Sequence, residues 1–159
     1  MDYFLMCQDE KLSEAIQPMG VTKVIPQEFF GKREQIEADE VPLQVYLKDS
    51  FCPVYVDFIE RPIPLISDKL KQVIERYQKE VFFKPVVLGD QRRMTQEVYW
   101  WMSPPSLSCL SQQSEFYPNQ TIRKLVLDAD KITGYHIFRI NGVMEKLIVV
   151  DLALAESIL

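Results

Sequence analysis

The spacing of apolar residues changes abruptly near residue 80, and this change most constrains how the chain can fold. Four apolar residues recur at i, i+3, i+4 and i+7, which places them on one side of a helix: Leu70, Val73, Ile74 and Tyr77. Ser67 or Asp68 can cap this helix, because a side-chain oxygen there accepts from the first-turn amides. The pattern predicts an amphipathic helix over about 68–79.

Beyond residue 80 the apolar residues follow the period of a strand. VFFKPVVLGD predicts a strand over 81–88 with a turn at Gly89-Asp90, and EVYWWM predicts the next strand. Pro85 has no amide proton, so the first of these strands is expected at a sheet edge or at a bulge.

The C-terminal part predicts further strands and one more helix. IRKLVL at 122–127 reads as a strand, and HIFRI–NG–VMEKLIVV reads as a hairpin that turns at Asn141-Gly142. DLALAESIL predicts a short terminal helix capped by Asp151. A long connection, SPPSLSCLSQQSEFYPNQ, precedes them.

The first third of the chain carries weaker signals. YFLMC at 3–7 predicts a short buried strand, EKLSEAIQ at 10–17 a short helix, and the alternation over 43–48 a strand. The remainder of 1–57 predicts an irregular, acidic part of the molecule.

Together these elements predict an α+β fold with a mainly antiparallel sheet. Consecutive strands joined by short turns favour antiparallel pairing, and the helices are expected on one face. At 159 residues the chain fits a single domain over 1–159, with an irregular part at 1–57 and an α+β core at 58–159.

The adjacent tryptophans in QEVYWWMSPP are open to two interpretations. In a strand, Val98, Trp100 and Met102 share one face, which is expected to be core, and Tyr99 and Trp101 share the other. The second pair is core if something covers that face. Otherwise it is an exposed aromatic patch of the kind that partners bind.

Charge is distributed unevenly along the chain. Residues 1–60 contain 12 acidic and 5 basic residues, a net charge of −7, whereas the whole chain carries −5. An acidic run contributes to this charge: Glu34, Glu37, Asp39 and Glu40. The run is either a solvated surface or a docking surface that speeds association with a basic protein partner. The balance argues against binding of nucleic acid, which needs a basic face.

Signals for chemistry are few. The single histidine, His136, could pair with Cys109 or a nearby serine as a nucleophile and base, although a lone histidine at a strand start is usually structural. Glycine-rich phosphate loops and metal-binding motifs are missing from the sequence, so we expect no cofactor and no metal.

The sequence also allows a prediction of where the protein resides. The N-terminus MDYFLMCQDEK does not resemble a signal peptide, and the longest uncharged run, 98–114, contains two prolines and cannot span a membrane. Three scattered cysteines suit a reducing compartment. We therefore expect a cytoplasmic protein that does not bind membranes.

The order of several stretches resembles a known bacterial family. FIERPIPLISDKLKQVIERY, VFFKPVVLGD, YWWM, LSCLSQQSEFYPN, KLVLDADKI, HIFRI and LIVVDLALAESIL follow one another over about 58–159. They are similar to small bacterial proteins partly grouped with the immunity protein 11 class of polymorphic-toxin systems. The resemblance implies a bacterial protein that neutralises a toxin by binding it.

Three hypotheses follow. The first is a non-catalytic protein-binding module that occludes a toxin, steered by the acidic run and anchored by exposed aromatic residues: Tyr99, Trp101, Phe116 and Tyr117. The second is a small hydrolase using His136 with Cys109 or a serine. The third is a self-associating structural protein, a homo-oligomer paired through a strand edge.

Overall fold

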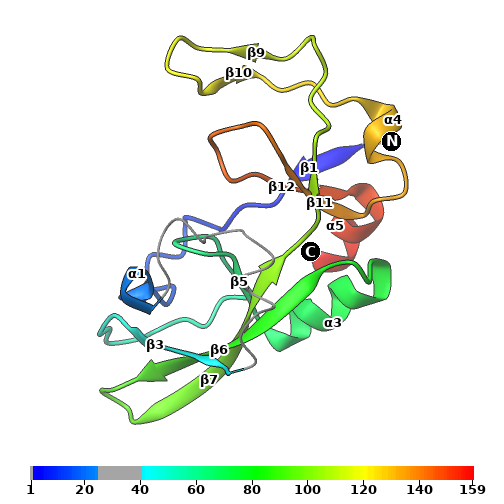
Figure 1. Cartoon of the computed structure of the whole chain (residues 1–159). Coiled ribbons are helices and arrows are strands. Elements are labelled where there is room, and N and C mark those ends of the chain that lie inside the picture. The colour runs from blue at the N-terminus through cyan, green and yellow to red at the C-terminus, as the bar shows by residue number, and fades with distance from the viewer. Residues whose placement is uncertain (1, 25–40) are drawn as a thin grey trace. The chain divides into compact units, whose positions relative to one another are not determined.

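The computed structural model describes residues 2–24 and 41–159, which divide between two compact units (Figure 1). Unit 1 takes its described residues from Met1–Met6, Arg76–Glu80 and Pro104–Leu159. Unit 2 takes them from Cys7–Glu75 and Val81–Ser103. The single domain over 1–159 stays a prediction.

Unit 2 is built on a mixed sheet in the order β2-β3-β6-β7-β5-β4. Its strands are β2 (Pro18–Met19), β3 (Leu43–Leu47), β4 (Phe58–Ile59), β5 (Leu65–Ile66), β6 (Phe82–Asp90) and β7 (Thr95–Ser103). Neighbours pair antiparallel except β3 and β6, which run parallel. This parallel pair was not predicted, because nothing local in a sequence specifies which distant strand becomes a neighbour.

The hairpin of β6 and β7 is the longest feature of this sheet. Its register runs without a shift from Phe82 opposite Ser103 to Asp90 opposite Thr95. The predicted turn at Gly89-Asp90 is therefore wrong, because both residues belong to β6 and the chain turns at 91–94. Gly89 instead allows the Tyr46 ring to lie close to the backbone of β6, because a Cβ at this position would lie 3.0 Å from Cδ1 of that ring.

Pro85 lies in an interior strand, although the sequence predicted an edge or a bulge. β3 pairs with β6 only from Val86 to Gly89, so this pairing begins one residue beyond Pro85. On the β7 side Pro85 lies opposite Trp100. Its missing amide proton therefore falls outside the β3 pairing, which explains how an interior strand contains it.

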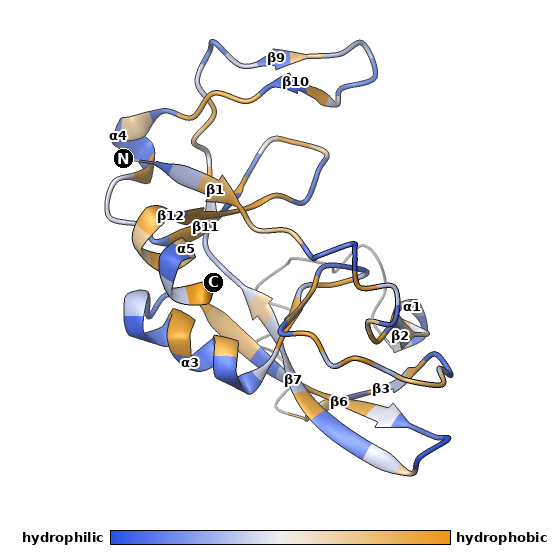
Figure 2. Cartoon of the chain, turned by 180° about the vertical axis from the view of Figure 1, so that it is seen from behind, coloured by the Kyte–Doolittle hydropathy of each residue, from blue (hydrophilic) through white to orange (hydrophobic). Residues whose placement is uncertain are grey.

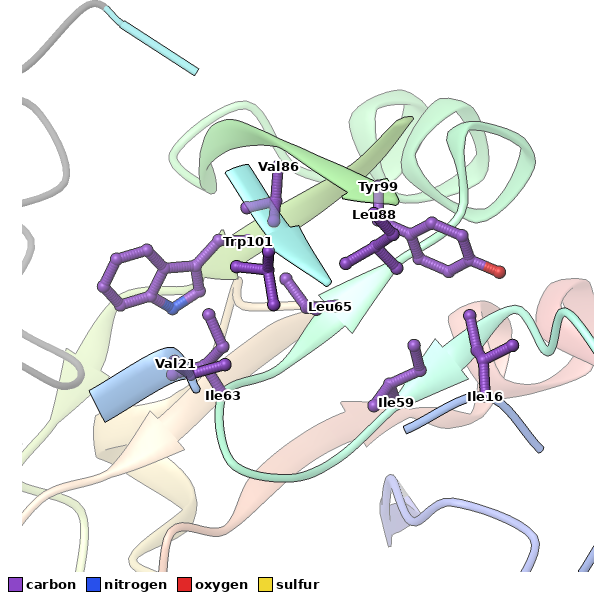
Figure 3. Packing of buried hydrophobic residues seen from close by; sticks show 10 residues of the cluster. Ile16, Val21, Ile59, Ile63, Leu65, Val86, Leu88, Tyr99 and Trp101 are labelled. Carbon is purple, nitrogen blue, oxygen red and sulfur yellow. The ribbon is translucent and has the colours of Figure 1, made fainter. Parts of the chain in front are cut away.

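One face of this sheet supports the core of unit 2 (Figure 3). Tyr99 and Trp101 project from β7 into a cluster with residues from other strands and from the N-terminal segment: Ile16, Val21, Val45, Ile59, Ile63, Leu65, Val86 and Leu88. The Tyr99 hydroxyl donates a hydrogen bond of 2.7 Å to the carbonyl oxygen of Val56. The buried phenol is therefore satisfied.

The helix α3 (Asp68–Tyr77) packs on the opposite face of the sheet at one end. Asp68 accepts a hydrogen bond of 3.2 Å from Nε1 of Trp100, and the Lys71 ammonium lies 4.5 Å from the centre of a Trp100 ring. Leu70 and Ile74 form the buried stripe of the helix, as predicted. Figure 2 shows hydrophobic and hydrophilic bands alternating along α3. The helix ends two residues earlier than the sequence predicted.

Unit 1 contains a sheet in the order β1-β12-β11-β8 and a separate two-stranded ribbon. Its elements are β1 (Tyr3–Leu5), β8 (Ser106–Leu107), β9 (Glu115–Phe116), β10 (Ile122–Lys124), α4 (Ala129–Ile132), β11 (Ile137–Ile140), β12 (Ile148–Asp151) and α5 (Leu152–Ile158). β9 and β10 form the ribbon, and β8 runs parallel to β11. Figure 2 shows β11 and β12 as strongly hydrophobic.

The predicted hairpin near the C-terminus is present with a wider loop. β11 and β12 pair antiparallel, with Arg139 opposite Ile148, so the connection extends well beyond Asn141-Gly142. Gly142 has φ of 85°, the positive value that the sequence motif favours. Asp151 caps α5 as predicted, accepting from the amide of Leu154 at 2.9 Å.

The N-terminal segment departs most from the sequence-based expectations. The strand at Tyr3–Leu5 exists, but Phe4 and Leu5 are exposed rather than buried. The predicted helix over 10–17 is wrong, because this segment forms turns and a single bridge between Ala15 and Val54. A four-residue helix, α1 (Val21–Val24), follows instead.

The predicted class is confirmed: the fold is α+β, its strands pair mostly antiparallel, and α3 is the longest helix within residues 2–24 and 41–159. Among the described residues, no helix has both the length and the apolar character that crossing a membrane requires.

Candidate binding surface

The structure places Tyr99 and Trp101 inside the core of unit 2. Trp101 is 2% exposed and Tyr99 is also buried, so neither side chain offers a surface to a partner. The opposite face of β7 differs from the prediction. Val98, which the alternation assigned to the core, is 49% exposed, and its prediction as core is wrong.

The exposed part of that face consists of two rows of residues across three strands. Strand register aligns Gln44, Val87 and Val98 in one row. It aligns Tyr46, Gly89 and Gln96 in the next, and residues in register point to the same side of a sheet. We call this surface the open face and define it as Gln44, Tyr46, Val87, Gln96 and Val98.

Helix α3 covers the neighbouring rows and stops short of the open face. The Lys71 ammonium lies over a Trp100 ring and 5.1 Å from the centre of the Phe83 ring. Both aromatic residues belong to the rows beside the open face, on the side nearer to α3. Tyr46 remains 48% exposed and Val98 49% exposed. The open face is thus the end of a sheet face whose other end is covered by a helix.

A depression of about 400 Å³ adjoins the open face at the tip of the β6–β7 hairpin. It is lined by Tyr46, Gly89, Asp90, Gln91, Met94, Thr95 and Gln96. Met94, at φ of 54° in the turn, is among the most exposed large apolar side chains of the described residues. The apolar surface therefore extends from the strands into the turn.

Ionic contacts fix this turn. The Asp90 carboxylate accepts from the Arg93 amide at 3.1 Å and from Arg93 Nη1 at 3.0 Å. Burial alone would raise the pKa of Asp90, but these hydrogen bonds from Arg93 bring it below its ordinary value. Arg92 pairs with Asp49 at 3.4 Å and lies over the exposed ring of Phe51.

Phe116 and Tyr117, the other predicted anchors, lie on the β9–β10 ribbon of unit 1 and are both exposed. Phe116 lies opposite Ile122, and the Tyr117 amide donates to the Thr121 carbonyl at 2.8 Å. Glu115 and Arg123 form an exposed ion pair at 3.7 Å across the ribbon. These two aromatic residues form a second, smaller exposed surface.

The four acidic candidates lie outside the described residues: Glu34, Glu37, Asp39 and Glu40. Their role in steering stays a prediction.

The structure does not bring Cys109 to His136 within hydrogen-bond distance. Cys109 is fully buried in the core of unit 1 beside Phe138 and Val149. Burial raises the pKa of its thiol, which disfavours the reactive thiolate. His136 instead contacts Asp151, with 2.6 Å between Nδ1 and Oδ2.

Nearby serines form hydrogen bonds with backbone groups. The Ser114 hydroxyl donates to the Val126 carbonyl at 2.8 Å and accepts from the Val126 amide, and Ser111 accepts from the Gln113 amide. Within residues 2–24 and 41–159, no group of three metal-ligating side chains occurs.

Sequence reasoning missed Tyr46 and Val98. Tyr46 alternates with Leu43, Val45 and Leu47 in the predicted strand over 43–48, and this alternation was the available signal that it faces away from the core. The exposure of Val98 depends on where α3 ends over the sheet, which no local pattern encodes.

Comparison of the chain with models of known protein families, with curated proteins and with solved structures finds no match.

Proposed function

We propose that this chain is a protein-binding module whose open face contacts the partner. The supporting observation is the pair Tyr46 and Val98, two large apolar side chains that are about half exposed on adjacent rows of a regular sheet. Contiguous apolar surface bordered by polar groups is typical of interaction sites. Here Gln44 and Gln96 supply that polar border.

The rigidity of this surface favours tight binding. The Tyr46 ring lies against Gly89, and Gln44 Nε2 donates to the Val87 carbonyl at 3.3 Å, so both side chains are held in place. Side chains that are already ordered lose less conformational entropy when a partner binds. Tyrosine is also enriched among the residues that dominate binding energy.

The partner that we propose is a basic protein. The net charge of −7 over residues 1–60, which include β3, favours association with positive charge. The resemblance to immunity protein 11 suggests a cognate bacterial toxin, neutralised by occlusion of its surface. The acidic run would act mainly on the rate of association.

The test begins with capture of a stoichiometric partner from a lysate of the source organism and continues with affinity measurements on the purified pair. We expect Tyr46→Ala to weaken binding by about 2 kcal/mol, roughly 30-fold in Kd. Phe116→Ala is the matched control, since it removes an equally exposed aromatic side chain from unit 1.

A loss of affinity in Phe116→Ala alone would move the binding surface to the β9–β10 ribbon. Unchanged affinity in both variants would reject the open face as the contact. Solution mass measured on the same samples shows whether the partner is a second copy of this chain.

A further inference from the structure

Unit 1 contains a histidine–carboxylate pair that the binding proposal does not use. His136 precedes β11, and Asp151 ends β12, which pairs with β11. Nδ1 of His136 lies 2.6 Å from Oδ2 of Asp151, while the second oxygen, Oδ1, accepts from the Leu154 amide at 2.9 Å. The carboxylate is thus held between the imidazole and the start of α5.

This contact determines where the imidazole carries its proton. A carboxylate oxygen accepts hydrogen bonds and has no proton to donate, so Nδ1 must be the donor. In the neutral ring the lone pair then resides on Nε2. Asp151 therefore sets the tautomer of His136. Carboxylates that accept from one ring nitrogen fix the tautomer and orientation of histidines at metal sites in the same way.

Neighbouring groups hold the ring and its backbone. Oε1 of Gln78, a buried side chain, accepts from the amides of His136 at 2.8 Å and Ile137 at 3.0 Å. The Tyr77 ring lies edge-on to the imidazole, with 5.5 Å between ring centres. Ser157 donates to the Ala153 carbonyl, so its hydrogen bond with Tyr77 has the Tyr77 hydroxyl as donor.

The other ring nitrogen is open to solvent. The His136 side chain is 38% exposed. Nε2 has no hydrogen-bond partner within the described parts of the chain. It is also not buried, because the one buried side-chain atom without a partner among the described residues is Oε2 of Glu145. The pair therefore presents an oriented imidazole with a free lone pair on Nε2.

We propose that His136 is a nucleophilic catalytic residue that acts on solvent-accessible carboxylic esters, with Asp151 as its positioning residue. Nε2 attacks the acyl carbon, a bond from nitrogen to the acyl carbon forms, and the carbon–oxygen bond to the alcohol breaks. The alcohol leaves as an alkoxide that takes a proton from water, while the acylated ring keeps its Nδ1 proton in contact with Asp151. A second water then attacks the acyl carbon, releases the carboxylic acid, gives a proton to solvent and restores the neutral ring.

The surroundings favour acyl transfer over phosphoryl transfer. Phosphoryl transfer relies on cations that neutralise the transferring group. The charged group in contact with His136 is the carboxylate of Asp151, and its negative charge disfavours an incoming phosphate. An acyl-imidazole intermediate requires only the oriented nitrogen and access to the ester.

The chain itself supplies a clean test, because it contains a single histidine. The exposed thiols of Cys7 and Cys52 are first alkylated, since thiols also react with esters. p-Nitrophenyl acetate is then added to the native protein, release of p-nitrophenolate is followed, and the acetylated peptide is identified by mass spectrometry. We expect acetylation at His136, at a rate above that of free imidazole at the same pH.

Two variants separate chemistry from folding. His136→Asn keeps a donor toward Asp151 and removes Nε2, so the reaction at this position should disappear while the fold persists. Asp151→Asn keeps an oxygen that can cap α5, and we expect it to slow acetylation of His136 about 10- to 100-fold. Asp151→Glu, which retains a carboxylate, should restore part of the rate.

A second measurement needs no variant. The wild-type chain unfolded in guanidinium presents the same histidine without Asp151. Equal acetylation rates at His136 in the native and unfolded chain would overturn the proposal, as would acetyl groups found only on lysines. A native rate above both the unfolded chain and free imidazole supports it.

Discussion

Two hairpin-like pairs of strands show how differently this chain uses aromatic residues. β6 and β7 pair over nine residues each and place Tyr99 and Trp101 in a packed core. β9 and β10 pair over two and three residues and leave Phe116 and Tyr117 exposed. Aromatic residues in a strand are therefore buried where a long register gives them a sheet to pack on, and exposed where the ribbon is too short to support a core.

The strongest test of this contrast is the removal of a ring from each pair. We expect Trp101→Ala to lower the free energy of unfolding by about 3–5 kcal/mol, because it leaves a cavity in a core that cannot close around it. Phe116→Ala should change this free energy by less than about 0.5 kcal/mol. Urea denaturation followed by circular dichroism measures both. Similar costs for the two variants would contradict the contrast.

The pair His136–Asp151 gives unit 1 a polar counterpart to the apolar core of unit 2. Asp151→Ala removes both the cap of α5 and the acceptor for His136, and we expect a loss of about 2 kcal/mol in unfolding free energy. Asp151→Asn keeps the cap and should cost about half as much, or about 1 kcal/mol. Thermal and urea unfolding of the two variants measure the difference. Equal losses would show that the cap contributes nothing.

Alkaline pH separates the buried phenol of Tyr99 from exposed phenols. Burial, and then the negative charge of Asp57, raises the pKa of Tyr99 well above its ordinary value. Because the folded chain holds this proton more tightly than the unfolded chain, the stabilisation is complete below pH about 10. It is lost as pH rises from there toward the folded pKa, by at most about 1.4 kcal/mol per pH unit.

Tyr99→Phe removes this contribution, so its unfolding free energy should fall less steeply than that of the wild type above pH about 10. At neutral pH the variant loses the hydrogen bond to Val56 and should be less stable by about 1 kcal/mol. Denaturant titrations at a series of pH values compare the two chains. Parallel curves at alkaline pH would contradict the burial of the Tyr99 hydroxyl.

The smallest effect concerns the open face. A methyl group at Gly89 would press on the Tyr46 ring, so we expect Gly89→Ala to cost about 1 kcal/mol. In a Tyr46→Ala background the same substitution should cost less, because the ring is gone and only Nε2 of Gln44, 3.1 Å from the added Cβ, has to move. A double-mutant cycle by urea denaturation measures this coupling. Independent effects would show that Tyr46 does not rest on Gly89.

Local patterns predicted the elements whose signals are local. The helical spacing of Leu70 and Ile74 located α3, and Asp151 was identified as a cap because its role involves only the next few residues. The exposure of Val98 could not be predicted in this way. It depends on the distance that α3 reaches over β7, which is a property of the assembled sheet.

The candidate sites divide in the same way. Phe116 and Tyr117 were predicted as exposed aromatic anchors; both side chains are exposed, and their binding role stays a prediction. The contact of His136 with Asp151 joins two strands whose pairing was expected, but the predicted two-residue turn gave them another register. Cys109 was a candidate nucleophile only because sequence spacing cannot exclude its pairing with His136. Its complete burial argues against that role.

The alternation of β7 also gives the molecule two optical reporters in consecutive residues. Trp100 lies beside the Lys71 ammonium and hydrogen-bonds to Asp68, whereas Trp101 is enclosed by apolar side chains. Their fluorescence therefore samples a polar and an apolar environment, and a soluble quencher reaches the first indole more readily than the second. In Trp100→Phe the remaining emission reports only the interior of unit 2. In Trp101→Phe it reports only the face beneath α3, so the two sides of one strand can be followed separately as the chain unfolds.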